Sequence, residues 1–239
     1  MNELLNKTIS QIVTDYHQTA PVFEKFGIDF CCKGKRPLTD ACTERALNKE
    51  EVLAELNHAI ESQASPTDFN SLSLTALADY IVRTHHTYVK FNAPQIFNYV
   101  SRVATKHGDR FPFMKEVLQL FAEVQEDMNQ HMLKEERILF PRIKALETEA
   151  AVNVSLEYYT GPINVMEEEH DRAGELMYKI RELTNNYSVP EGACTTFQLS
   201  LASLQAFEAD LHQHVHLENN ILFPRAIEMI KKLNKQVAN

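Results

Sequence analysis

Two segments of the chain repeat one histidine–glutamate spacing ahead of the same five residues, ILFPR. The first segment reads HMLKEERILFPR and begins at His131, and the second reads HVHLENNILFPR and begins at His214. In each segment a glutamate, Glu135 or Glu218, follows four residues after the histidine. Residues four apart on an α-helix project from one face, about 6 Å apart along the axis. Each segment can therefore direct an imidazole nitrogen and a carboxylate at one point, as metal-binding helical bundles do.

The repeat extends beyond these two segments, because each is preceded at a similar interval by another histidine. His85 comes before the first segment and His170 before the second. Each half of the repeat would then be a helical hairpin, with a histidine on its first helix and H-x-x-x-E on its second. Two such hairpins packed face to face would bring six side chains together on the bundle axis. The predicted metal ligands are His85, His131, Glu135, His170, His214 and Glu218.

The chemistry of this set favours a pair of iron or manganese ions. Zinc needs only four ligands, and the set contains no thiolate; calcium and magnesium prefer shells made only of oxygen. Imidazole mixed with carboxylate in a bundle core is typical of a dinuclear iron or manganese site. With both glutamates bridging, each metal would receive two nitrogens and two carboxylate oxygens, and an oxo or hydroxo bridge would add a fifth ligand. An octahedral iron would keep one open position, which would suit binding of O₂ or NO, or release of the metal.

Two residues beside the predicted ligands receive separate interpretations. His86 would project about 100° away from His85 on an α-helix, so only one of the two can face the axis. The apolar residues Ile81 and Val82, three to four positions earlier, favour His85 as the inward residue. Glu169 immediately precedes His170, and it is a candidate for a carboxylate behind the ligands or in a channel leading to them.

The adjacent cysteines Cys31 and Cys32 form a second candidate site. They lie in a predicted loop that is rich in lysine and arginine, and nearby positive charge lowers the pKa of a thiol and raises its reactivity. Neighbouring residues are too close along the chain for an ordinary disulfide with each other. The pair is therefore a candidate redox or docking site, and two buried small apolar side chains are the alternative.

Helical periodicity and breaker residues predict an all-α protein of two parts. Residues 1–65 read as a small helical domain that contains the two cysteines, and the segment SQASPTDFNSLS reads as a linker. Residues 70–239 contain four long amphipathic stretches with short connections, which predicts an up-down four-helix bundle. The third of these helices is expected to begin after a loop around Gly161 and Pro162.

The overall composition narrows the function classes. The formal net charge is −9 and there is no basic run, which argues against a nucleic-acid partner. No apolar run approaches the roughly 20 residues needed to cross a bilayer, and the first residues lack the pattern of a signal peptide. We therefore expect a cytoplasmic protein without a membrane partner.

The chain resembles the repair-of-iron-centres family, whose bundle is a hemerythrin-type domain. The resemblance lies in TAPVFEKFGIDFCCKGKRPLTDAC in the N-terminal part, and in THH, HMLKEERILFP, EEHDRAGEL and HLENNILFPRA in the bundle. It implies a di-iron protein, with Glu135 and Glu218 bridging two iron ions. It also implies a protein that helps to restore iron–sulfur clusters damaged by nitric oxide or peroxide, by supplying iron to damaged iron–sulfur proteins.

Two alternatives remain open at this point. The same centre could reduce nitric oxide with electrons from an external donor, or it could bind or sense O₂ or NO without catalysis. Oxygen-carrying hemerythrins use five histidines, whereas the repeat in this chain offers four unless His86 joins them. This difference weakens the oxygen-carrier interpretation. The sequence leaves the oligomeric state open, with a homodimer as one option.

Overall fold

The computed structural model describes residues 3–61, 68–148 and 155–237. The described chain is built from helices, and its one isolated β-bridge joins Thr8 to Pro37. The first half of the predicted linker, residues 62–67, lies outside the described residues. Among the described helices, none has the combination of length and hydropathy needed to cross a lipid bilayer.

The N-terminal part is a small unit of short helices. Thr8 caps the second helix: its hydroxyl accepts from Gln11 N, and the Gln11 side chain accepts from Thr8 N. Gly27 adopts a left-handed φ of +64° just after the next α-helix. The helices are α1 (Glu3–Asn6), α2 (Ile9–Asp15), the 3₁₀ turn η1 (His17–Thr19), α3 (Ala20–Lys25), α4 (Leu38–Glu44) and α5 (Lys49–Glu61).

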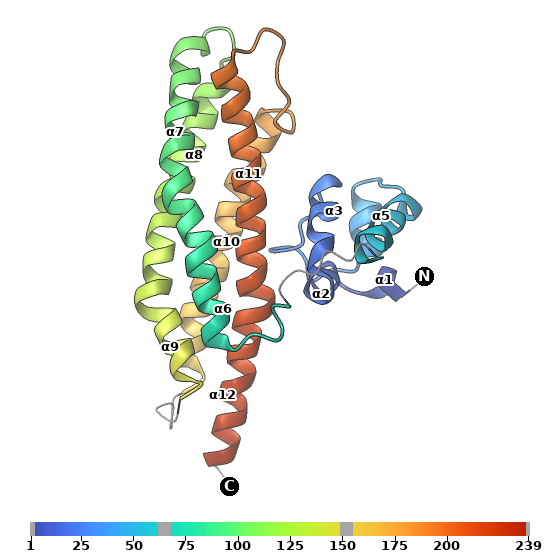
Figure 1. Cartoon of the computed structure of the whole chain (residues 1–239), viewed down its shortest axis with the longest axis vertical. Helices are drawn as coiled ribbons and strands as arrows, with labels where there is room; N and C mark the ends of the chain where they lie inside the picture. The colour runs from blue at the N-terminus through green and yellow to red at the C-terminus, as the bar shows by residue number, and fades with distance from the viewer. Residues whose placement is uncertain (1–2, 62–67, 149–154, 238–239) are drawn as a thin grey trace.

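The remaining helices form an up-down four-helix bundle, as the sequence predicted (Figure 1). Three of the four long helices of the bundle are interrupted by a short π-helical segment, labelled η2, η3 or η4. In Figure 1 the small N-terminal unit lies beside α11, about midway along the bundle. In chain order, the four long helices consist of the following elements: first α6 (Leu74–Ile81), η2 (Val82–His86) and α7 (Thr87–His107); second α8 (Phe113–Lys134), η3 (Glu135–Leu139) and α9 (Phe140–Ala145); third α10 (Glu157–Leu183); and fourth α11 (Thr195–Leu217), η4 (Glu218–Leu222) and α12 (Phe223–Val237).

A layer of buried polar side chains divides the apolar core of the bundle into two clusters. One cluster contains Phe121, Leu204 and Phe207 and continues into the N-terminal unit through Phe23 and Phe30. The other cluster fills the opposite end of the bundle, where α6, α9, α10 and α12 meet. Buried histidine and glutamate are rare in protein cores unless they are paired or bind a metal. The polar layer is therefore the feature of the bundle that needs a functional explanation.

The N-terminal unit packs directly on α11 and η4. The ring of Phe30 lies 5.6 Å from that of His216 and 6.0 Å from that of His212. Asn220 donates a hydrogen bond to the carbonyl of Cys31 at 3.2 Å, and Glu24 pairs with His212 at 2.5 Å. These contacts hold the cysteine loop against the bundle.

The third long helix begins earlier than predicted. The sequence suggested a loop around Gly161 and Pro162, but both lie inside α10, which starts at Glu157. Pro162 has no N–H to donate to the carbonyl of Tyr158. Arg142 donates to that carbonyl instead, at 3.0 Å, so the helix continues through the proline.

Candidate metal centre

Three π-helical segments in the described chain carry residues of the polar layer. His85 and His86 end η2, Glu135 begins η3 and Glu218 begins η4. Single π turns inside α-helices often occur at functional sites. In η3 and η4 the repeat explains the π-helical turn, because each segment is followed by the proline of ILFPR. That proline cannot donate the usual α-helical hydrogen bond, and the wider turn precedes it in both copies.

Six side chains converge in two groups that share both glutamates. In each group the possible ligand atoms all lie within 4.8 Å of one another, and all the residues are buried. The two histidine pairs have similar geometry: the ring centroids of His86 and His214 are 4.9 Å apart at 59°, and those of His131 and His170 are 4.6 Å apart at 55°. The first group is His86, Glu135, His214 and Glu218, and the second is His131, Glu135, His170 and Glu218.

Each glutamate is approached by one histidine from each group. Glu135 Oε2 lies 3.3 Å from Nε2 of His86 and 3.2 Å from Nε2 of His131. Glu218 contacts Nε2 of His214 through Oε1 at 2.9 Å and Nε2 of His170 through Oε2 at 3.0 Å. The two carboxylates therefore lie between the two histidine pairs, where each could bridge two metal ions.

Three of these histidines use their other ring nitrogen in a hydrogen bond. His86 Nδ1 lies 2.8 Å from Glu136 Oε1 and His170 Nδ1 lies 2.9 Å from Asn219 Oδ1. His131 Nδ1 lies 3.0 Å from Oε2 of Glu169. Metal-binding histidines usually donate their second N–H in this way, which fixes the ring and leaves Nε2 for the metal.

The two partners Glu136 and Glu169 reach the surface of the bundle and each meets a lysine there. Lys90 Nζ lies 2.6 Å from Glu136, and Lys134 pairs with Glu169. The hydrogen bond from His131 lowers the pKa of Glu169 to about 2, with Lys134 adding to the effect against burial. From the sequence, Glu169 was a candidate for a carboxylate behind the ligands or in a channel, and its contact with His131 has the geometry that the first of these roles requires.

His85 lies outside both groups, although the sequence favoured it over His86. Its Nδ1 lies 3.0 Å from Asp210 Oδ1, and its ring stacks on that of His214 at 5.6 Å and 6°. The expectation assumed the 100° step of an α-helix from Ile81 and Val82. The π-helical segment η2 changes that step, so His86 Nε2 faces the glutamates instead.

The six buried donors fit a pair of cations. Glu135 and Glu218 are fully buried. Within the described residues, hydrogen bonds of normal geometry do not reach His86 Nε2, either oxygen of Glu135, or Oε2 of Glu218. A buried carboxylate without compensation is costly, so these atoms are suited to binding positive charge. Nitrogen and carboxylate donors without sulfur agree with iron or manganese.

In the metal-free protein, protonated histidines supply part of the positive charge beside the two buried glutamates. Burial lowers the pKa of His86 and His131, but the nearby carboxylates of Glu135 and Glu218, with Glu169 as a further contribution at His131, outweigh it and raise the two values to about 9 and about 10. The pKa of Glu218 is well below its ordinary value, because the histidines around it outweigh the effect of burial. Metal binding must therefore displace protons, so iron affinity should fall as the pH decreases.

These shifts predict how the stability of the metal-free protein depends on pH. A histidine whose pKa is raised on folding stabilises the fold below its unfolded pKa of about 6.5, and this stabilisation is lost as the pH rises through the folded value. We expect the melting temperature in chelator to decrease between about pH 7 and pH 10, through His86 and His131. The metal-loaded protein should show a smaller decrease. Equal decreases in both forms would contradict this assignment.

The two predicted thiols lie together at the contact between the N-terminal unit and the bundle. Asp29 Oδ1 accepts hydrogen bonds from the backbone N–H of Cys31 and of Cys32, each at 3.0 Å. The two sulfur atoms are 3.6 Å apart. The hydrogen bond with Cys32, burial and the charge of Asp29 raise the pKa of Cys31, opposite to the lowering expected from the surrounding lysines. Cys32 is the partly exposed member of the pair.

Several partners of the site were not predicted from the sequence, although the repeat contained a signal for two of them. Glu136 and Asn219 occupy the same position in the two copies, immediately after the shared glutamate, and each contacts a histidine Nδ1. The alignment alone did not reveal the shared role, because one copy has a carboxylate at this position and the other an amide. No comparable sequence pattern indicates Asp210, because its contact with His85 joins two different long helices of the bundle.

Comparison with known proteins identifies both parts of the chain. Residues 5–60 match a domain of unknown function, ScdA_N (DUF542), and residues 77–226 match the hemerythrin HHE cation-binding domain. The iron–sulfur cluster repair protein YtfE of Escherichia coli is 33% identical over 222 residues, covering 93% of this chain and 97% of that protein. The protein of the same name from Shigella boydii matches to the same extent. The hemerythrin domain implies iron binding. With these two domains and this similarity, the chain belongs to the repair-of-iron-centres family.

Proposed function

We propose that the protein binds two iron ions in the polar layer and repairs damaged iron–sulfur clusters by donating iron. The observation that carries the proposal is the pair of buried glutamates, each placed between histidines of both groups. The relatives named above are iron–sulfur cluster repair proteins, which supports the same role here. In this proposal residues 1–65 carry the thiols, residues 70–239 carry the iron, and damaged iron–sulfur proteins are the recipients.

The donor count supports releasable iron. Each group offers four residues, and both glutamates are counted twice because they are shared. Iron supplies a Lewis-acidic, redox-active centre when it is bound. The protein residues supply the rest: the histidines present Nε2, Glu136 and Glu169 fix two of the rings, and Lys90 and Lys134 connect these carboxylates to the surface. A proton that replaces iron on His86 or His131 would be held well, which favours release over a permanently closed site.

The proposal can be tested by transfer of labelled iron. Protein loaded with ⁵⁷Fe would be incubated anaerobically with a hydratase whose [4Fe–4S] cluster has lost one iron. We expect the label to enter the hydratase cluster and its activity to return, faster than with an equal amount of free ferrous iron in the presence of a chelator. If activity returns only at the rate set by free iron, the protein is not the donor.

Nitric oxide reduction at the same centre is the second candidate, and the incomplete coordination of each group favours it. Four donors per metal leave room for a small ligand. Steady production of N₂O from NO, with an external reductant and no loss of bound iron, would support this reaction. Reversible O₂ binding without either activity would support a carrier or sensor instead.

The choice between His86 and His85 gives a direct test of the ligand set. We expect His86→Ala to lower bound iron to roughly a tenth of the parent value or less under limiting iron, because it removes an Nε2 that faces Glu135. His85→Ala is the matched control: it removes a neighbouring buried imidazole that contacts Asp210 and lies outside both groups. Metal analysis after desalting measures the ratio. Loss of iron in His85→Ala alone would reverse the assignment.

A further inference from the structure

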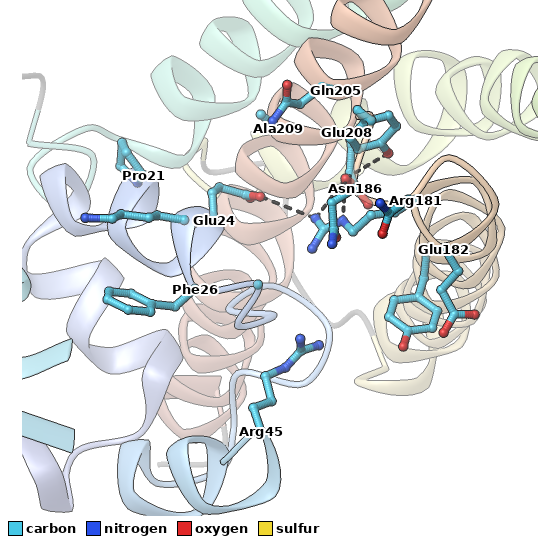
Figure 2. A pocket seen from close by; sticks show the side chains of 15 residues that line it. Pro21, Glu24, Phe26, Arg45, Arg181, Glu182, Asn186, Gln205, Glu208 and Ala209 are labelled. Atoms are coloured by element: carbon cyan, nitrogen blue, oxygen red, sulfur yellow. Dashed lines mark hydrogen bonds and ion pairs between the residues drawn. The ribbon is translucent and has the colours of Figure 1, made fainter. Parts of the chain in front are cut away.

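A large cavity lies between the N-terminal unit and the bundle, and none of the six side chains in the two ligand groups lines it. Its volume is about 920 Å³, within the usual range for small-molecule sites. Figure 2 shows Glu24, Phe26 and Arg45 on the side of the N-terminal unit and Arg181, Asn186 and Glu208 on the side of the bundle. We call this space the interdomain cleft.

The interdomain cleft narrows to a small inner cavity of about 50 Å³ that reaches the two thiols. Cys31 and Cys32 line the inner cavity, and Gly27, Arg45 and Arg181 line both spaces. A Cβ on Gly174 would meet Cys32 Sγ at 3.7 Å, an ordinary van der Waals distance, so α10 passes directly beside this sulfur. The inner cavity has room for a thiol group, whereas the interdomain cleft has room for the rest of a molecule.

Arg45 is the cation that remains available for a ligand in this space. Arg181 is held by Glu208, with a contact of 2.7 Å and a hydrogen bond of 2.8 Å, and Lys25 pairs with Glu55. Within the described chain Arg45 forms no ion pair, and in Figure 2 its guanidinium points into the open space. Its Nη1 would lie 2.9 Å from a Cβ at Gly27, so this glycine leaves space for the arginine.

The wall of the interdomain cleft contains a strained segment. Asn185, Asn186 and Tyr187 follow α10 with φ values of +47°, +55° and +58°, and all three line the cleft. Left-handed backbone at residues other than glycine is uncommon and persists only where surrounding contacts hold it. Here the Tyr187 hydroxyl donates to Glu208 at 2.9 Å. The cleft is therefore bounded by a fixed wall on the bundle side.

We propose that the interdomain cleft binds a small disulfide that carries carboxylates, of the glutathione disulfide class, and that Cys32 exchanges with it. The Cys32 sulfur, as the thiolate, attacks one sulfur of the bound disulfide. A bond forms between Cys32 and that sulfur, the original S–S bond breaks, and the other half leaves as a thiolate that takes up a proton. The protein gains a mixed disulfide, and one small thiol is released.

The choice of Cys32 and of an anionic ligand follows from the geometry. Cys31 is only 4% exposed, whereas Cys32 is partly exposed at the inner cavity. Asp29 fixes both backbone amides, which keeps the two sulfurs in place. A carboxylate in the cleft can form charge-assisted hydrogen bonds with the guanidinium of Arg45. This site is separate from the metal centre and does not depend on which metal function is correct.

The experiment compares the rates at which two cysteines react in the full-length, iron-loaded protein. Glutathione disulfide would be added, samples quenched with acid over time, and adducts located by peptide mass spectrometry. The internal reference is Cys194, which is exposed beside His107 at the N-terminal end of α11. We expect Cys32 to react at least about tenfold faster than Cys194, the ratio that corresponds to one ordinary charged contact.

Two variants and a second reagent make the test specific. Arg45→Gln should slow the reaction of Cys32 by about tenfold and leave that of Cys194 unchanged. Cystamine, a disulfide with ammonium ends, should react more slowly than glutathione disulfide at Cys32, and Arg45→Glu should reverse this order. Equal rates at the two cysteines, or no effect of Arg45→Gln, would overturn the proposal. Iron content and melting temperature, measured on the same samples, separate this outcome from loss of the metal centre or of the fold.

Discussion

Glu218→Leu is expected to abolish stable iron binding. Glu218 is fully buried and contacts Nε2 of both His170 and His214, so its removal takes a shared ligand from both groups at once. We expect less than roughly a tenth of the parent iron content after desalting, since losing even a residue behind the ligands costs 10- to 100-fold in affinity. Metal analysis and the absorption spectrum of anaerobically purified protein provide the measurement.

The stability of the same variant should no longer respond to iron. In the metal-free parent, Glu135 and Glu218 are two buried carboxylates whose charges repel each other, as the raising effect of Glu218 on the pKa of Glu135 shows, although the histidines hold that pKa below its ordinary value. Leucine removes this repulsion, but it also removes a carboxylate that the surrounding histidines stabilise in the folded protein, as the lowered pKa of Glu218 indicates. We therefore expect the metal-free melting temperature to fall. With iron added, the parent should gain stability by ligand linkage and the variant should not.

A glutamate on the surface is the matched control for this substitution. Glu228 lies on α12 and pairs with Lys232, four residues later on an exposed helix face. Glu228→Leu should keep the iron content and the iron-dependent rise in melting temperature of the parent. A parent-like iron ratio in Glu218→Leu would show that the two buried glutamates are not the shared ligands.

The part of the site that follows helical periodicity could be predicted from the sequence, and the part that depends on π-helical turns could not. His131 with Glu135, and His214 with Glu218, lie four residues apart, and the structure places both pairs in the polar layer. The step from an apolar face to a histidine favoured His85, whereas the structure places His86 in the polar groups and His85 outside them. This step crosses η2, where the hydrogen-bonded turn is one residue wider than in an α-helix.

The bundle itself was predictable because its evidence is spread over many residues. Four amphipathic stretches with short connections admit few arrangements, and an error at one boundary, such as the start of α10 at Glu157, does not change the topology. The interdomain cleft was not predictable. It depends on the placement of the N-terminal unit against α11, and on contacts between residues as distant in sequence as Glu24 and His212. Single-sequence patterns contain little information about such pairs.

Glu208→Ala is expected to destabilise the fold more than the loss of a surface ion pair. Glu208 is 3% exposed and accepts hydrogen bonds from Arg181 at 2.8 Å and from the Tyr187 hydroxyl at 2.9 Å. Burial alone would lower the pKa of Arg181, but the charge of Glu208 raises it above its ordinary value. Removing the carboxylate leaves a largely buried cation and a buried hydroxyl without their partner. Breaking such a buried pair costs about 3–5 kcal/mol, which corresponds to a decrease of roughly 10 °C in melting temperature for a chain of this size.

The surface pair of Arg172 with Asp127 supplies the control for Glu208→Ala. These side chains lie 2.8 Å apart, but they are 62% and 34% exposed, so Asp127→Ala should change the free energy of unfolding by no more than about 1 kcal/mol. Equal decreases in the two variants would contradict the role given to Glu208. A structural consequence distinguishes them further: Arg181 also approaches Glu24 of the N-terminal unit at 3.6 Å. Freeing Arg181 should therefore weaken this contact and speed alkylation of Cys32 in Glu208→Ala, whereas Asp127→Ala should alkylate at the parent rate.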